Sequence, residues 1–168
     1  MASQLQGQTN PVQRLLDGAN SVIRQTRFCW LVTESYDSKP AVRPMGQVLE
    51  ADDCLQVRFI TDSTSRKTEE ISSEGRVQLL FSHETADAFV VLAGEATVVT
   101  DPEAIAVRWK SSYGRYFLTA EDRLRAAFIE VTPRLLKLWI RGVTPEPYGV
   151  RPTVLTCRTG SEWIELEG

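Results

Sequence analysis

The sequence has few of the residues that build disulfides, metal centres or membrane spans. Its three cysteines, Cys29, Cys54 and Cys157, are widely spaced and form no CxxC pair, which argues against a disulfide framework or a zinc ribbon and fits a reducing compartment. A single histidine, His83, excludes a metal centre built on several imidazoles, and we expect no metal. The N-terminus has no basic patch followed by an apolar core, and no run approaches the ~18 apolar residues of a membrane span. We therefore expect a cytoplasmic protein that does not bind membranes.

Common nucleotide and hydrolase motifs are absent as well. The glycines never fall in the GxGxxG or GxxxxGK[ST] order of known phosphate loops, and no serine lies in a GxSxG motif. A Ser-His-Asp triad would depend on His83, which we expect to be a solvent-facing or capping side chain at the end of a strand. A net charge of -3 and a pI near 5.3 give no global attraction for nucleic acid. Any anion site must therefore be local.

The composition is that of an ordinary globular protein. At 168 residues, with 42% hydrophobic and 24% charged residues, the chain can bury a continuous core without metals or disulfides. Nothing in its middle has the composition of a linker. We therefore expect one domain over residues 1–168, with residues 1–10 and 143–168 as peripheral tails.

Apolar spacing and capping residues predict three helices. Residues 11–25 place apolar side chains three and four apart, as on one face of an amphipathic helix. A second helix over residues 65–73 is expected to stop at Gly75, since glycine suits the left-handed backbone after a helix. A third begins at Pro102, with the preceding aspartate as its cap. The segment 111–126 is predicted to be a loop with a partial helix.

Most of the remaining chain has the composition and period of strands. Strands are predicted over residues 28–34, 41–50, 55–61, 77–83 and 88–99, and over 128–133 and 135–143 as one interrupted strand or a hairpin. Residues 41–50 and 55–61 are expected to form a hairpin through an Asp-Asp turn, and 77–83 and 88–99 a second hairpin. A short strand at 153–157 follows an irregular segment. About six strands at hairpin spacing with short helices inserted predict a mainly β fold, an antiparallel sheet closed into a barrel.

The first candidate site lies in the strand 41–50, at Arg43, Pro44, Met45 and Gly46. A proline cannot donate to a β ladder, so it marks an edge strand or a bulge and leaves backbone groups free. Free backbone groups beside a glycine suit the hydrogen-bonding edge of a planar heteroaromatic ring. A plain edge strand without a ligand is the alternative.

The second candidate site follows Thr61, where a strand ends and a helix begins. Arg66 and Lys67 place two cations in the first helical turn, which opposes the helix dipole by about 0.3–1 kcal/mol each and is offset only partly by two following glutamates. A bound anion would reverse this cost, and helix-start amides with hydroxyls such as that of Ser65 would complete a phosphate site. The alternative is an exposed helix whose cations pair with its own glutamates. Trp109 and the aromatic residues near it are interpreted as core.

The order of these segments resembles the pyridoxamine 5'-phosphate oxidase-like family of FMN-binding split β-barrels, in particular its general stress protein branch. The resemblance covers approximately residues 12–141 and rests on PAVRPMG, VRFITDSTSRKTEEI, VQLLFS, FVVLAGEATVVTDPEAIAVRW and FIEVTPRLLKLW. It implies a six-stranded antiparallel split barrel of Greek-key type and a homodimer with two FMN sites at the subunit interface. The cofactor-binding residues that it implies are Arg43, Pro44, Met45, Gly46, Ile60, Thr61, Ser65, Arg66, Lys67 and Trp109.

The departures from the family pattern concern activity. The segment after Trp109 lacks the family's usual phenylalanine-proline-glycine sequence, and the C-terminus lacks an arginine-rich ending, which argues against vitamin B6 oxidation. We expect an oxidoreductase that uses FMN with a small molecule or NAD(P)H, and we assign no catalytic residue. The alternatives are a non-catalytic protein that binds flavin, or haem through His83, on the same fold, and a deazaflavin-dependent reductase.

Overall fold

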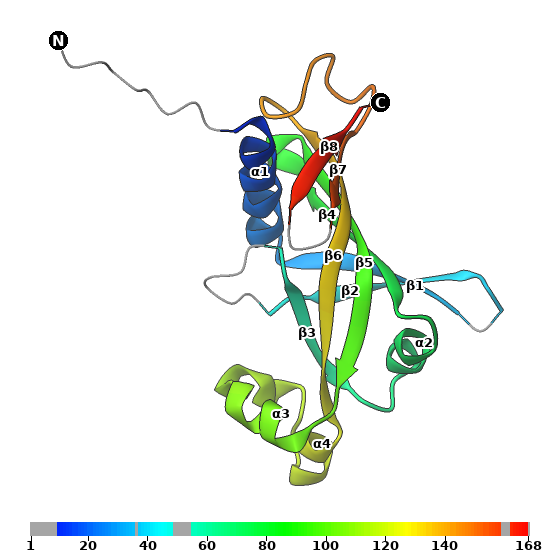
Figure 1. Cartoon of the computed structure of the whole chain (residues 1–168). Helices are drawn as coiled ribbons and strands as arrows, with labels where there is room; N and C mark the ends of the chain where they lie inside the picture. Colours follow the sequence, from blue (N-terminus) through cyan, green and yellow to red (C-terminus); the bar gives the residue numbers. More distant parts are fainter. Residues whose placement is uncertain (1–9, 36, 49–54, 159–161, 168) are drawn as a thin grey trace.

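The computed structural model describes residues 10–35, 37–48, 55–158 and 162–167, which form a mainly antiparallel β structure with short helices (Figure 1). The strands are β1 (Phe28–Glu34), β2 (Pro40–Gly46), β3 (Val57–Asp62), β4 (Arg76–His83), β5 (Ala88–Val99), β6 (Ala126–Ile140), β7 (Thr153–Cys157) and β8 (Trp163–Leu166). The α-helices are α1 (Pro11–Gln25), α2 (Arg66–Glu74), α3 (Pro102–Arg108) and α4 (Ala120–Leu124), and the 3₁₀ helices are η1 (Glu84–Ala86) and η2 (Ser111–Arg115).

Six strands follow one another around the barrel in the order β2, β1, β4, β5, β6, β3. The long strand β6 connects two parts of the sheet, because its first half pairs with β3 and its second half with β7, while β5 lies along its other edge. Fully buried side chains from several strands fill the interior, among them Phe59, Phe81, Leu92 and Leu136. The mainly β, antiparallel fold class predicted from the sequence is confirmed.

The barrel is split between β2 and β3. Strand β2 pairs along its whole length with β1, and β3 pairs with β6, so the predicted hairpin of residues 41–50 with 55–61 is wrong. Within the described residues the two sides meet at an isolated bridge between Val48 and Arg58. The predicted Asp-Asp turn lies outside the described residues. Period-two patterning identifies a strand but not its partner, which is why the sequence did not exclude this hairpin.

Residues 126–140 form one strand, which settles the choice between an interrupted strand and a hairpin. Pro133 lies in its middle, opposite Gly94 of β5, where the register between the two strands shifts. A proline lacks the N–H of a ladder bond, so it is accommodated at this irregularity. The described strands number two more than the six expected, because β7 and β8 extend the sheet beyond β6, and β8 was not predicted.

The predicted helices are found where sequence signals indicated them. Helix α1 has the bounds expected from its apolar spacing and packs against β4, β5 and β6. Gly75 ends α2 with a positive φ of 70°, and Asp101 caps α3 by accepting a hydrogen bond from the amide of Ala104. Residues 102–125, which hold α3, η2 and α4, form a separate helical lobe at the foot of the barrel (Figure 1).

The described ranges contain no helix long and apolar enough to cross a bilayer, and no cluster of side chains suited to a metal ion. Cys29 and Cys157 are free thiols, and burial raises the pKa of the Cys29 thiol to about 12. Cys54 lies outside the described residues. His83 is partly exposed at the end of β4, 3.3 Å from the hydroxyl of Thr85.

Gly94 provides a test of the β5–β6 packing. A Cβ atom at this position would lie 2.2 Å from the carbonyl oxygen of Thr132, so Gly94→Ala requires the two strands to separate. We expect this substitution to lower the free energy of unfolding by about 3 kcal/mol, the upper end for overpacking, as measured by urea denaturation. The control is Gly114→Ala, where a Cβ atom meets nothing within 4 Å and the expected change is under about 0.5 kcal/mol. Equal effects of the two substitutions would contradict this account.

Candidate functional site

A tight turn carries the chain from β3 into α2. The Asp62 carboxylate accepts hydrogen bonds from the amide of Thr64 at 2.8 Å and from its hydroxyl at 2.7 Å, and the side chain of Arg125 donates to the other carboxylate oxygen. The hydrogen bonds from Thr64, and then the contact with Arg125, hold the pKa of Asp62 below its ordinary value. The turn is therefore fixed against the helical lobe. Ser65 follows it as the N-cap of α2 and makes no side-chain capping bond.

A buried carboxylate, that of Glu70, joins α2 to β1 and β2. Its side chain is 5% exposed and forms ion pairs with Arg43 at 2.7 Å and Arg66 at 2.9 Å. The hydroxyl of Thr33 also donates to Glu70, and Arg43 donates to that hydroxyl. Burial acts to raise the pKa of Glu70, but the hydrogen bonds from Thr33 and Arg43 outweigh it, so the net shift is downward.

Lys67 adds a third positive charge to this group. Burial and the nearby charge of Arg43 lower the pKa of Lys67, while Asp62 acts in the opposite direction. Among the described residues Lys67 makes no ion pair. Arg43, Arg66 and Lys67 are here called the cation cluster. Glu70 pairs with the two arginines, and Asp62 is the acid that acts on Lys67. The expectation that helix cations pair with their own glutamates holds for Arg66, but Arg43 comes from a strand far away in the sequence.

The first candidate site continues along β2 from the cation cluster. Strand β2 is an edge strand of the sheet, as the proline predicted. Met45 is buried in the core, whereas Pro44 and Gly46 are exposed on the opposite face. A hollow of about 220 Å³, here called the lobe hollow, is lined by Gly46 and Gln47 on one side and by Ile60 and the helical lobe on another.

Two other predicted residues lie near this edge or in the lobe. Thr61 is buried in β3 and, with Ile60, lines an adjoining hollow of about 330 Å³. Trp109 contributes to the core of the helical lobe, where its indole makes edge-to-face contacts with Tyr113 and Phe117 at 5.7 Å. The structure therefore brings together the residues of β2, β3 and α2, and places Trp109 in the neighbouring lobe.

Sequence reasoning missed two contributors to this region. Glu70 was considered only as a partner of Arg66 within the helix, because its contact with Arg43 spans 27 residues. Gln47 was not singled out; its amide donates to the carbonyls of Ile23 and Thr26, and its Oε1 atom is buried with no partner among the described residues. No local sequence signal could have found these contacts.

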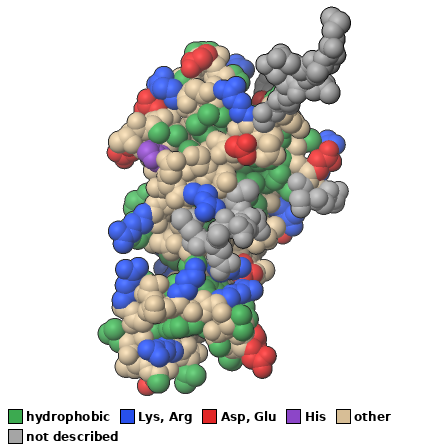
Figure 2. Space-filling model, turned by 90° about the vertical axis from the view of Figure 1, so that its left-hand side faces the viewer, with side chains coloured by type: hydrophobic (Ala, Val, Ile, Leu, Met, Phe, Trp, Pro, Cys, Tyr) green, Lys and Arg blue, Asp and Glu red, His purple; other side chains and the backbone are tan. Residues whose placement is uncertain are grey.

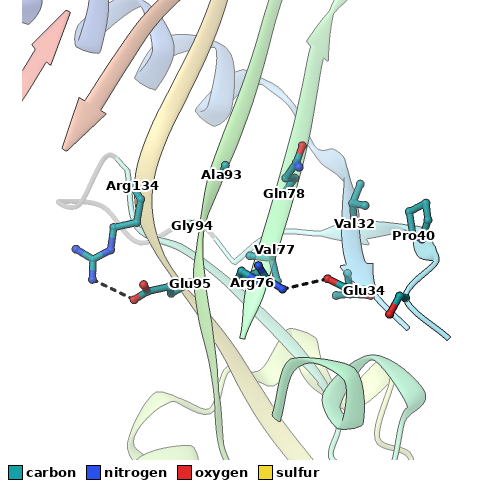
Figure 3. A pocket seen from close by; sticks show the side chains of 12 residues that line it. Val32, Glu34, Pro40, Arg76, Val77, Gln78, Ala93, Gly94, Glu95 and Arg134 are labelled. Carbon is teal, nitrogen blue, oxygen red and sulfur yellow. Dashed lines mark hydrogen bonds and ion pairs between the residues drawn. The ribbon is translucent and has the colours of Figure 1, made fainter. Parts of the chain in front are cut away.

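A hollow of about 580 Å³ lies on the outer face of β1, β4 and β5 (Figure 3). Val32, Gln78 and Ala93 form one row across its floor, because each lies opposite the next in the strand register. Ion pairs flank it on two sides, between Arg76 and Glu34 and between Arg134 and Glu95 (Figure 3). This hollow is therefore relevant to what covers the outer face of the sheet.

Removing the Glu70 carboxylate should release β2 from α2. We expect Glu70→Gln to lower the free energy of unfolding at neutral pH by about 3 kcal/mol, because two arginines lose a buried partner. Since the pKa of Glu70 is lowered by folding, its contribution is present above the ordinary value of 4.5 and is lost as pH falls below it. The difference between the variant and the wild type should therefore shrink in acid. Urea denaturation of the variant and the wild type between pH 7 and pH 3 measures this difference in the free energy of unfolding. Glu69→Gln, at an exposed position, is the control. A difference between Glu70→Gln and the wild type that does not change with pH would contradict the prediction.

Comparison with known proteins identifies the family of this chain. The family model described as pyridoxamine 5'-phosphate oxidase like matches residues 16–143, more than half of the chain. No curated protein sequence matches. Among solved structures, general stress protein 26 from Bacillus anthracis str. Sterne is 20% identical, with a TM-score of 0.63 over 91% of this chain and 99% of that one.

Two further solved structures share the fold. A pyridoxamine 5'-phosphate oxidase-related, FMN-binding protein from Nostoc punctiforme PCC 73102 is 15% identical, with a TM-score of 0.67 and full coverage of both chains. A heme-binding protein from Mycobacterium smegmatis is 14% identical, with a TM-score of 0.61 over 89% of this chain and 59% of that one. With the split barrel and the family match in agreement, the chain belongs to the pyridoxamine 5'-phosphate oxidase-like family.

Proposed function

We propose that this protein binds FMN as a homodimer and acts as an FMN-dependent oxidoreductase on a small molecule. The observation that carries the proposal is the cation cluster, in which Arg43 and Arg66 pair with Glu70 and Lys67 lies near Arg43 at the start of α2. Glu70 carries one charge for two arginines, and Asp62, which acts on Lys67, is already paired with Arg125, so a dianionic phosphate would neutralise the positive charge that remains. The first amides of α2 add donors at the same place.

The residues along β2 fit the rest of the cofactor. Gly46 lies three residues beyond Arg43, about 10 Å along an extended strand, which leaves room for a ribityl chain between phosphate and ring. Gly46 and the unpaired edge of β2 allow a planar ring to approach the backbone, and the buried Oε1 of Gln47 is an acceptor suited to a ring N–H. When bound, FMN supplies reversible hydride and electron transfer. The chain contributes binding and orientation.

The outer face of the sheet supports the homodimer. Phe28, Trp30 and Val42 are 54%, 52% and 56% exposed, an apolar surface that isolated soluble proteins rarely leave uncovered. Trp30 lies opposite Pro44 on one neighbouring strand and Leu80 on the other, two residues along β1 from Val32, which lines the 580 Å³ hollow. In a two-fold interface the same surface of each copy must supply both the protruding side chains and the hollows that receive them. This face of the sheet has both. A second copy there would cover the outer side of β2.

Experiments distinguish FMN from the two other candidate cofactors, a deazaflavin and haem. A deazaflavin shares the flavin's ring shape, so parallel titrations of the two compounds decide between them. Haem would need an axial ligand. Thr33, which donates to Glu70, lies opposite Val77 of β4, and His83 is six residues further along that strand, about 20 Å away, so a haem at the cation cluster would have no histidine ligand from β4. Reduction of bound FMN by NADPH, followed by reoxidation with an acceptor, separates an oxidoreductase from a protein that only binds flavin.

The phosphate assignment is tested by comparing FMN with riboflavin, which has the same ring and ribityl chain without the phosphate. We expect Lys67→Ala to weaken FMN binding about 10- to 100-fold, the loss of one charged hydrogen bond, and to leave riboflavin binding nearly unchanged. Flavin fluorescence titration measures both. Arg151→Ala, at an exposed position between β6 and β7, is the control and should change neither. A wild-type protein that does not distinguish FMN from riboflavin would refute the phosphate site.

The dimer is tested by a charge on the outer face. Trp30→Glu should convert the dimer to a monomer, because a carboxylate buried between two apolar faces would be unpaired. Sedimentation velocity measures the mass, and FMN titration of the same variant should show weakened binding. Val107→Glu is the matched control, since Val107 is 86% exposed but lies on α3. A wild-type monomer that binds FMN fully would exclude the interface while leaving the phosphate site intact.

A further inference from the structure

Arg125 of the helical lobe is bound to the turn that leads from β3 into α2. Its Nε atom lies 3.1 Å from one carboxylate oxygen of Asp62, and its carbonyl oxygen accepts a hydrogen bond from the amide of Ser63 at 2.7 Å. The strand register brings these residues together, because Asp62 ends β3 opposite Ala126, the residue that follows Arg125. Both the side chain and the main chain of Arg125 therefore hold this turn.

The helical lobe holds the same side chain from the other side. The guanidinium of Arg125 also donates to Asp122 at 2.8 Å and lies 3.8 Å from a carboxylate oxygen of Glu121. Asp122 in turn belongs to the capping box of α4, in which it exchanges hydrogen bonds with Thr119. An arginine can make several such contacts at once because its N–H groups form a planar fork. Arg125 is thus oriented by its own helix as well as by Asp62.

Asp62 and a bound anion would compete for the positive charge of Lys67. Burial and the charge of Arg43 lower the pKa of Lys67, and the charge of Asp62 raises it. One carboxylate oxygen of Asp62 accepts from Thr64 and the other from Arg125, and Lys67 pairs with neither within the part of the chain that the structure describes. Without the guanidinium, the second oxygen would lose its donor while Lys67, five residues further on, remained within reach of its charge. A lysine paired with its own aspartate offers less charge to a ligand.

The helical lobe has an excess of positive charge from which Asp62 can be neutralised. Residues 102–125 hold five basic and three acidic side chains, Arg108, Lys110, Arg115, Arg123 and Arg125 against Glu103, Glu121 and Asp122. Figure 2 shows lysine and arginine side chains gathered where the lobe meets the barrel. In a chain of net charge -3, the lobe therefore supplies a counter-ion for Asp62 that is not taken from the cation cluster.

We propose that Arg125 is a positioning residue for the anion site at the start of α2: it neutralises Asp62 and so keeps Lys67 available to the ligand. That this ligand is FMN rests on the proposed function. Arg125 acts through Asp62 rather than on the phosphate itself. The two side chains are 40% and 38% exposed, so the effect of their ion pair is moderate. The contact also makes the placement of the helical lobe a determinant of the charge state of the cation cluster.

The proposal is tested in the full-length protein with Arg125→Gln, Asp62→Asn and the double variant. We expect Arg125→Gln to weaken FMN binding about 3- to 10-fold in flavin fluorescence titration and to leave riboflavin binding unchanged. Asp62→Asn keeps an acceptor for Thr64, so this variant and the double variant should bind FMN within about twofold of the wild type or more tightly. Arg123→Gln is the control, since Arg123 lies in the same helix over the ring of Trp109 and should change FMN binding less than about twofold.

A second measurement does not depend on flavin. The pKa of Lys67 is followed by heteronuclear NMR of protein with labelled lysine, and its signal is assigned with Lys67→Arg. Arg125→Gln should raise the pKa of Lys67, because the charge of Asp62 is no longer neutralised, and the double variant should reverse this rise. Asp62→Asn alone should lower the pKa of Lys67. That variant tests the link between the two residues in a protein that keeps Arg125.

The outcomes separate this role from a merely structural one and from the flavin assignment. If the double variant binds FMN as weakly as Arg125→Gln does, or if Asp62→Asn alone is equally weak, the ion pair does not act by neutralising Asp62 and the proposal is refuted. An unchanged pKa of Lys67 in Arg125→Gln or in Asp62→Asn also refutes it. If the wild type binds no FMN while the pKa of Lys67 responds as expected, the proposed function fails and the positioning role stands.

Discussion

The buried carboxylate of Glu70 is the contact on which the arrangement of this site depends. It accepts hydrogen bonds from a strand hydroxyl, a strand guanidinium and a helix guanidinium, so β1, β2 and α2 are held at fixed positions around one pair of oxygens. A lone buried carboxylate would be costly, and these donors offset that cost. The split between β2 and β3 can therefore remain open without β2 moving away from the helix. The same contact orients Arg43 and Arg66 side by side.

This contact also leaves the site electrostatically incomplete. Glu70 stabilises Arg43 and Arg66 but carries one charge, and the pKa of Lys67 is lowered because burial and Arg43 disfavour its charged form. In a chain of net charge -3 such a group does not arise from a general excess of basic residues. A tightly bound phosphate would raise the pKa of Lys67 again, so ligand binding and the charge state of the cluster are linked.

The parts of the structure that the sequence predicted well depend on local signals. The apolar spacing of α1, the positive-φ glycine after α2 and the aspartate before α3 each act within a few residues. The partner of β3 could not be predicted, because the alternation that marks a strand is the same whether it pairs with β2 or β6. The proximity of the Arg43 strand to the Lys67 helix came from the family resemblance, and the contacts of Glu70 with Arg43 and of Gln47 with α1 had no sequence signal.

Strand β2 shows why a single segment can serve the core, the proposed cofactor and the proposed dimer at once. Side chains alternate along a strand, so Arg43 and Met45 point to the α2 side and the core, while Val42 and Pro44 lie on the outer apolar face. The unpaired edge of the strand is a third surface, independent of both faces. A shift of one residue in the β1–β2 register would carry Arg43 to the outer face and away from Glu70. The seven-residue pairing with β1 is therefore a condition for the cation cluster as well as for the fold.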